Sequence, residues 1–250
     1  GDVYKRQQFY RIKYDNGSKT ISSILDKKTG KELIESNHAY GFNTPLLKTG
    51  QENYSRIMSK DEIVTIKDQN PVRIILRVER PDELVETTEY ILWSNIDRVD
   101  IMHVLDLQKL KETKIIQQYS VGFPFNISNK KIKIELLGGF LDPEKDKLPG
   151  SSNKSHSIRR SAAIYNDLQS ISWSTVDSRI VQISEDGSVL LSNIVNNFPK
   201  DWNRYESNEG KLNLCYSFTS QEGNFNPSYT AKFGWELNTP ALLRKSWYST

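Results

Sequence analysis

Few side chains of this sequence have the types and spacing that enzymatic chemistry requires. None of the three histidines, His38, His103 and His156, has Asp, Glu, His or Cys at the short spacing that places two ligands on one metal ion. Cys215 is the only cysteine, so an intrachain disulfide is impossible, and we interpret it as a small half-buried residue. The sequence also has no Gly-rich phosphate loop, Gly-x-Ser-x-Gly elbow or His-Glu-x-x-His motif. We therefore predict no catalytic residue and no metal site in this chain.

His103 belongs to an apolar stripe of one alternating segment, where Val99, Ile101 and Leu105 have the same parity. Alternate residues of a strand point to the same face, so the His103 side chain is expected to face inward. The favoured interpretation is a hydrogen-bonded histidine in, or at the edge of, the core. The alternative is a ligand-binding histidine.

The segment 196–206 combines aromatic, amide and charged side chains away from the alternating pattern. Trp202 offers a stacking surface for the apolar face of a sugar ring, Asn203 an amide that donates and accepts, and Tyr205 a phenol. Loops of this composition on a rigid β scaffold are where binding usually lies. We predict that these three residues face a sugar, the alternative being that Trp202 plugs a corner of the core.

The elements that must hold such a loop are β-strands, because the dominant hydrophobic period of the chain is two. Turn dipeptides at Asn16-Gly17 and Asp186-Gly187 predict tight hairpins between neighbouring strands. The strands expected from the alternation are 9–14, 63–67, 72–79, 85–93, 99–107, 115–121, 131–136, 161–165, 171–175, 180–183, 212–218 and 229–237.

Many antiparallel strands in one chain need two packed sheets to bury their apolar faces, so we predict an all-β fold, a large antiparallel β-sandwich. Segment 106–114 has only a weak helical pattern, and 141–157 is polar and turn-rich, which indicates a long excursion from the sheets. The core is expected to include Leu76, Ile101, Phe123, Ile134, Leu214, Phe218, Phe233 and Trp235.

Composition narrows the classes of partner. The 34 Lys and Arg against 31 Asp and Glu leave a net charge of +3, too balanced to favour nucleic acid or an anionic membrane. No apolar run reaches the ~20 residues that cross a bilayer. The first seven residues, GDVYKRQ, do not continue into the pattern that follows, and we interpret them as a non-native scar before one domain over residues 8–250. We expect the sequence to be truncated at both ends. The residues do not indicate the cellular compartment of the protein.

Several stretches together resemble one enzyme family. FYRI at 9–12 and DKKTGKEL at 26–33 resemble the opening of the C-terminal β-sandwich of glycoside hydrolase family 38, the α-mannosidases. VDIMH at 99–103 resembles its central strand and VGFPF at 121–125 its aromatic-Pro-aromatic element. The segment 191–216, with its Trp-Asn, Gly and Tyr, resembles the family's bacterial-type segment.

The resemblance implies a super-sandwich like that of galactose mutarotase. It also implies a parent enzyme that cleaves α-mannosides with retention, using zinc and an Asp nucleophile, both in an N-terminal α/β domain absent from this sequence. The chain then resembles the non-catalytic C-terminal portion, with no cofactor of its own. Its partners would be the α-mannoside, through the parent enzyme, and the N-terminal catalytic domain of the same polypeptide.

Two other functions stay open on the residues themselves. One is a stand-alone carbohydrate-binding β-sandwich. The other is a mutarotase-like sugar epimerase, which needs a histidine and a carboxylate as acid and base on an open sugar ring. His103 or His156 could supply that histidine.

Overall fold

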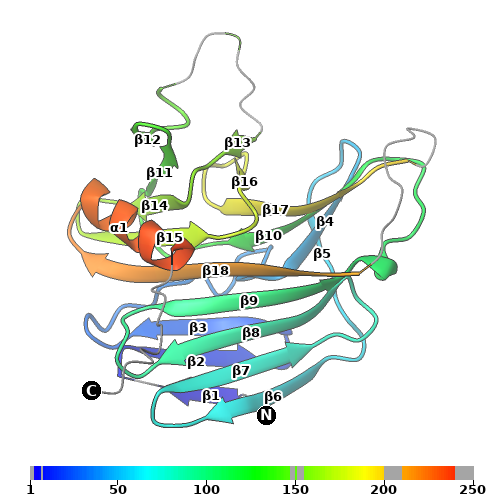
Figure 1. The fold of residues 1–250 in the computed structure, drawn as a ribbon, viewed down its shortest axis with the longest axis horizontal. Helices are drawn as coiled ribbons and strands as arrows, with labels where there is room; N and C mark the ends of the chain where they lie inside the picture. Colours follow the sequence, from blue (N-terminus) through cyan, green and yellow to red (C-terminus); the bar gives the residue numbers. More distant parts are fainter. Residues whose placement is uncertain (1–2, 7, 147–149, 151–154, 200–209, 240–250) are drawn as a thin grey trace, which may run out of the picture.

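The computed structural model describes residues 3–6, 8–146, 150, 155–199 and 210–239, and within them nearly every regular element is a β-strand (Figure 1). The largest sheet has nine strands. In spatial order they are β12 (Gly139–Leu141), β11 (Lys131–Leu136), β14 (Ser161–Tyr165), β15 (Gln169–Thr175), β18 (Lys211–Glu222), β9 (Val99–Asp106), β8 (Val85–Trp93), β7 (Arg73–Glu79) and β6 (Ile63–Gln69).

Two smaller sheets form the second layer, and they lie behind the large sheet in Figure 1. The six-stranded sheet has the order β13 (His156–Ser157), β16 (Ile180–Ile183), β17 (Leu190–Asn197), β10 (Gln117–Phe123), β4 (Pro45–Thr49) and β5 (Ser55–Arg56). The three-stranded sheet contains β1 (Val3–Arg6), β2 (Tyr10–Asp15) and β3 (Thr20–Asp26). The neighbouring strands of each described sheet pair antiparallel, so the predicted antiparallel β-sandwich is confirmed.

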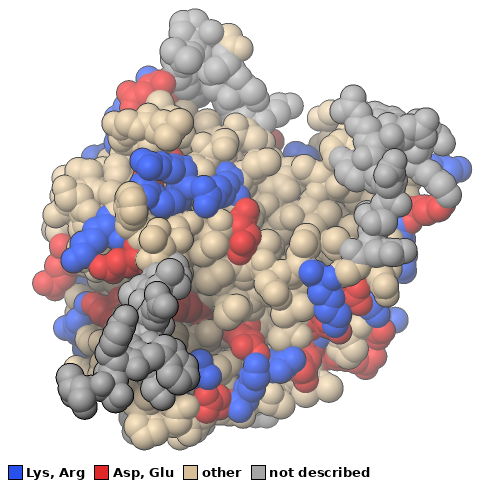
Figure 2. Space-filling model, viewed as in Figure 1, with Lys and Arg blue, Asp and Glu red and all other residues tan. Residues whose placement is uncertain are grey.

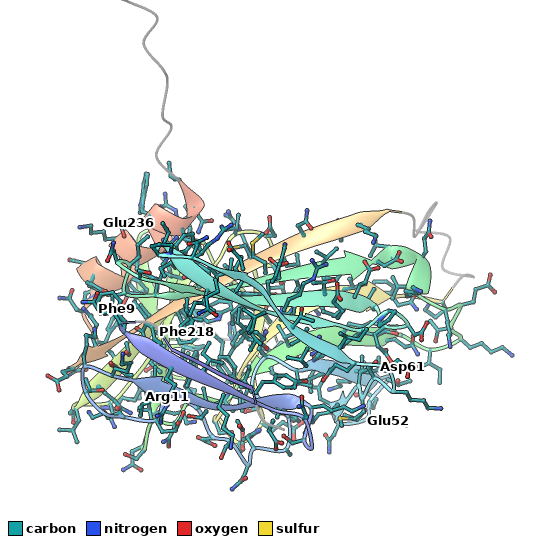
Figure 3. All side chains as sticks on the ribbon, turned by 90° about the horizontal axis from the view of Figure 1, so that it is seen from below. Phe9, Arg11, Glu52, Asp61, Phe218 and Glu236 are labelled. Carbon is teal, nitrogen blue, oxygen red and sulfur yellow. The ribbon has the colours of Figure 1, made fainter. Side chains whose placement is uncertain are left out.

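Both layers contribute aromatic rings to one continuous core. Phe218 on β18 contacts Phe42 and Phe125 from the second layer, with ring centroids 5.8 and 5.4 Å apart. Figure 3 places Phe218 between the layers, whereas Arg11 and Glu236 lie on opposite outer sides. Seven of the predicted core residues are buried: Leu76, Ile101, Phe123, Ile134, Leu214, Phe218 and Phe233.

The predicted strand 229–237 is wrong, because this segment belongs to helix α1 (Pro227–Asn238). Asn226 caps the helix by accepting the Tyr229 N–H at 3.1 Å, and Pro227 occupies the first turn, where its missing N–H costs nothing. The expected burial of Trp235 is also wrong, since its side chain is 50 % exposed. The helix buries Phe233 and packs on β14 and β15 of the large sheet.

The connections agree with the turn chemistry. Asn16-Gly17 lies in the connection from β2 to β3 and Asp186-Gly187 in that from β16 to β17, so both hairpins form as predicted, with connections over 16–19 and 184–189 that are longer than the tight turns expected. Segment 106–114 forms only a short 3₁₀ turn at Leu107–Lys109, named η1. The excursion after Leu141 leads from β12 in the large sheet to β13 in the six-stranded sheet.

Residues Val3–Arg6 pair with β2, while their interpretation as a scar stays a prediction. None of the described helices has the length and apolar character needed to cross a membrane.

Figure 2 shows the outer face of the large sheet with α1, where basic and acidic side chains are mixed around a broad uncharged area. The described residues of that face therefore form no continuous basic band of the kind that nucleic-acid binding uses.

Candidate functional site

The three residues predicted to face a sugar, Trp202, Asn203 and Tyr205, lie outside the described residues. The structure places the ends of the segment that contains them. β17 ends at Asn197 in the six-stranded sheet and β18 begins at Lys211 in the large sheet, so the segment connects the two layers. Their role in sugar contact stays a prediction.

His103 is a core residue, as its position in the apolar stripe predicted. Its side chain is fully buried, with Nδ1 lying 3.0 Å from the Thr88 hydroxyl and Nε2 3.0 Å from the Asn43 amide oxygen. The Asn43 amide nitrogen donates in turn to the Tyr90 hydroxyl at 3.2 Å, which leaves its oxygen as an acceptor for an Nε2–H. Burial, and after it the charge of Arg80, lowers the pKa of His103 to about 3. The ring is therefore neutral at ordinary pH and out of reach of any ligand.

The hydrogen-bond chain continues from His103 to a buried ion pair. Arg80 donates through Nη1 to the Thr88 hydroxyl at 3.0 Å, so that the Thr88 proton is available to His103 Nδ1. Arg80 Nε donates to Glu62 at 2.8 Å, and the Tyr14 hydroxyl donates to the other oxygen of Glu62. This network, in which each member is paired, links strands of the two layers.

An open hollow lies between the connection from β3 to β4 and the chain that follows β10. Its volume is about 580 Å³, within the range of small-molecule sites. Backbone hydrogen bonds fix its walls, from Glu35 N to Pro124 O and from Asn126 N to Leu33 O, both 2.9 Å long. The lining is mostly polar and comprises Glu32, Ile34, Glu35, Ser36, Asn37, His38, Ala39 and Asn126.

The polar side chains of the hollow differ in how many of their hydrogen-bonding atoms already have partners within the protein. Glu32 accepts the Ser23 hydroxyl at 2.5 Å and the Ile24 N–H at 2.6 Å, so both of its oxygens are occupied. Glu35 is ion-paired with Lys130 at 2.6 Å. His38 Nδ1 accepts the N–H of the Tyr40 backbone at 3.2 Å, which places the proton of the neutral ring on Nε2. The hollow thus combines a histidine with a carboxylate.

Sequence reasoning missed this hollow, because its histidine and carboxylates follow no motif. Nowhere in the described ranges do three His, Cys, Asp or Glu side chains lie close enough to hold a metal ion. The described donor set therefore does not fit a zinc ion. Burial raises the pKa of the Cys215 thiol to about 12, as expected of an unreactive half-buried cysteine.

Comparison with known proteins gives a structural likeness only. No family model and no curated protein sequence matches the chain. An α-mannosidase from Enterococcus faecalis V583 matches 95 % of this chain with a TM-score of 0.68 at 10 % identity. A glycosyl hydrolase family 38 protein from Enterococcus faecalis matches equally well, at 11 % identity. This chain covers 31 % and 32 % of those two proteins.

Smaller proteins of the mutarotase type also share the fold. A galactose mutarotase-like protein from Lactobacillus casei matches 88 % of this chain and 100 % of its own, with a TM-score of 0.52 at 10 % identity. A putative aldose 1-epimerase from Escherichia coli matches 89 % of this chain with a TM-score of 0.50. At these identities the likeness shows a galactose mutarotase-like β-sandwich, and nothing finer.

Proposed function

We propose that this chain is the C-terminal, non-catalytic β-sandwich portion of a family 38 α-mannosidase. In this proposal the hydrolysis of α-mannosides is carried out by an N-terminal zinc domain of the same polypeptide. The chain supplies architecture and part of the wall beside the substrate. Its partners are then that catalytic domain and, through the complete enzyme, the carbohydrate.

The observation that carries the proposal is the extent of the structural match. The α-mannosidase from Enterococcus faecalis V583 superposes over 95 % of this chain at a TM-score of 0.68, against 0.52 for the Lactobacillus casei mutarotase-like protein. The order of the sequence stretches that resemble family 38 supports the same proposal. The buried, neutral state of His103 supports a structural role for the most central histidine of the described sandwich.

The test compares this chain with the product of its complete gene. The chain by itself should not hydrolyse an aryl α-mannoside, with or without added zinc. The complete product should hydrolyse the same substrate and lose that activity on treatment with a chelator. Chelator-sensitive hydrolysis by the isolated chain, or a complete product inactive on α-mannosides, would overturn the proposal.

A mutarotase-like epimerase is a second candidate, and the open hollow is the observation that favours it. Epimerisation at C1 of an aldose needs a base and an acid that reach an open sugar ring. His38 presents a histidine and Glu35 a carboxylate to the same hollow. The match extends over 100 % of the Lactobacillus casei protein, so the shared fold includes all of that mutarotase-like protein.

Polarimetry separates this candidate from the first. If the chain is an epimerase, it should accelerate the mutarotation of freshly dissolved aldoses such as mannose, glucose and galactose. His38→Ala should abolish that acceleration without changing the thermal unfolding midpoint. A rate equal to that of buffer for all three sugars would exclude the epimerase reading for them.

A further inference from the structure

A second apolar cluster lies on the six-stranded sheet, on the face turned away from the main core. It consists of Leu46 on β4, Val189 just before β17 and Leu191 on β17, all three buried. Gly122 on β10 lies among them, because a Cβ at this position would be 3.4 Å from a side-chain atom of each. The outer face of this sheet is therefore locally flat and apolar, with a glycine at its centre.

Two tyrosines cover this cluster. Tyr54, just before β5, and Tyr40, in the chain leading to β4, pack on it with their ring centroids 6.3 Å apart in an edge-to-face arrangement. The Tyr54 hydroxyl accepts from Ser120 Oγ at 3.1 Å and donates to Gln182 Oε1 at 3.0 Å. Residues of β10 and β16 thus fix the Tyr54 ring, and Tyr54 in turn supports Tyr40. We call this pair the tyrosine surface.

Polar and charged groups surround the tyrosine surface. The Lys48 ammonium lies 5.6 Å from the centre of the Tyr54 ring, and the His38 ring lies 5.1 Å from that of Tyr40. His38 also lines the open hollow, so one side chain both borders the tyrosine surface and belongs to the hollow. Asp186, in the β16–β17 turn, is near enough to raise the pKa of Tyr40, although burial of the phenol contributes more.

We propose that the tyrosine surface, with the adjoining hollow, binds one pyranose unit of a carbohydrate. This inference rests on the proposed function and names a substrate-contacting site within it. The contact is non-covalent and lies outside the predicted loop 196–206. The stacking surface is Tyr40, oriented by Tyr54.

The chemistry of a pyranose matches these groups. Its ring has an apolar C–H face that packs on an aromatic ring, and its hydroxyls need donors and acceptors around that ring. The ammonium of Lys48 donates only, and the Asp186 carboxylate accepts. Hydrogen bonds from the Ser184 and Ser188 hydroxyls lower the pKa of Asp186 to about 2, so it is ionised throughout the neutral range.

The fixed geometry of Tyr54 favours binding for an entropic reason. The Tyr54 ring is already held by two hydrogen bonds. It therefore loses little conformational freedom when a ligand packs against Tyr40, which it supports. The competing role is purely structural, with both tyrosines acting as an apolar cover over Leu46, Val189 and Leu191. The two roles separate when the planar ring is removed and the apolar volume is kept.

Tyr40→Leu makes that separation, since leucine covers the cluster but offers no flat ring. The titrant is methyl α-D-mannopyranoside, and binding is followed by chemical-shift changes in the NMR spectrum of the isolated chain. The wild type should bind with a dissociation constant in the millimolar range. Tyr40→Leu should bind at least tenfold more weakly with an unchanged thermal unfolding midpoint. Tyr229→Leu is the matched control, because Tyr229 lies on α1, on the opposite side of the sandwich, and binding should not change.

Three results would overturn the site: no saturable shift in the wild type, equal affinity of wild type and Tyr40→Leu, or equal weakening by Tyr229→Leu. Lys48→Met gives a second measurement should Tyr40→Leu fail to fold, because it removes the ammonium and retains the methylene stem. We expect this variant to bind the mannoside several-fold more weakly. An unchanged affinity of Lys48→Met counts against the site. The titration can fail while the complete gene product still hydrolyses α-mannosides. It can also succeed while that product is inactive, so the two proposals fail separately.

Discussion

Acidification should destabilise this protein through His103. The unfolded histidine has a pKa near 6.5, whereas burial and Arg80 lower the pKa in the folded state to about 3. Between these two pKa values the unfolded chain binds a proton at His103 and the folded chain does not. The stability that depends on neutral His103 is therefore complete well above pH 6.5 and decreases as the pH falls toward 3. Each pKa unit corresponds to about 1.4 kcal/mol, which gives a loss of up to about 5 kcal/mol over the whole window.

The hydrogen bonds of His103 explain why its ring is not protonated in the folded protein. Thr88 accepts from Arg80 and therefore directs its own proton to His103 Nδ1, so a proton on Nδ1 would face a donor. Reversing Thr88 would not restore the pairing fully, because the Arg80 cation remains beside the new charge. A charged imidazole would also lose its hydration in the core.

The assay is urea unfolding followed by tryptophan fluorescence at a series of pH values from 7 to 4.5. Between pH 6.5 and 4.5 the histidine should account for about 2 kcal/mol of lost stability. His103→Gln is the reference variant, since glutamine offers one acceptor and one donor but does not titrate. All other ionisable side chains are the same in the two proteins, so their contribution cancels in the difference. Parallel stability curves for wild type and His103→Gln would refute the reasoning.

Three further predictions concern the core, the helix and the predicted loop. Phe218→Ala should cost about 3–5 kcal/mol in urea unfolding because its ring is fully buried among other aromatic rings, whereas Trp235→Ala should cost clearly less because half of its side chain is already exposed. Asn226→Ala removes the cap of α1 and should lower stability by about 1 kcal/mol, with Asn226→Asp, which keeps the acceptor, as control. In the complete gene product, Trp202→Ala and Asn203→Ala should lower kcat/KM for an α-mannoside at unchanged thermal stability; unchanged kinetics with lowered stability would mean that the loop is structural.

Local pattern was enough to determine most of the strands. The alternation over 85–93, 161–165 and 180–183 predicted β8, β14 and β16 with the boundaries observed. The turn dipeptides placed two hairpins, and the parity of His103 placed it in the core. These features follow from the sequence because side-chain direction in a strand depends only on the residue's position along that strand.

The hydrophobic pattern predicted the wrong element where the same residues fit both the period of a strand and that of a helix. Tyr229, Phe233 and Leu237 are consistent with alternation and also with helical spacing of four. The signal that decides between them is the Asn226-Pro227 start, which is typical of a helix. The packing of α1 on the large sheet then leaves Trp235 half exposed.

Only the tertiary structure brought together the groups that could contact a ligand. The hollow joins the chain after β3 to Asn126 beyond β10, and the tyrosine surface joins Tyr40 and Tyr54 to Ser120 and Gln182. Residues so far apart in sequence share no local pattern, because their proximity depends on which strands become neighbours. The sequence by itself determined strands, turns and inward-facing positions. The outer face of the six-stranded sheet was decided by the order β16, β17, β10 and β4, because the order of strands in a sheet arises from long-range pairing.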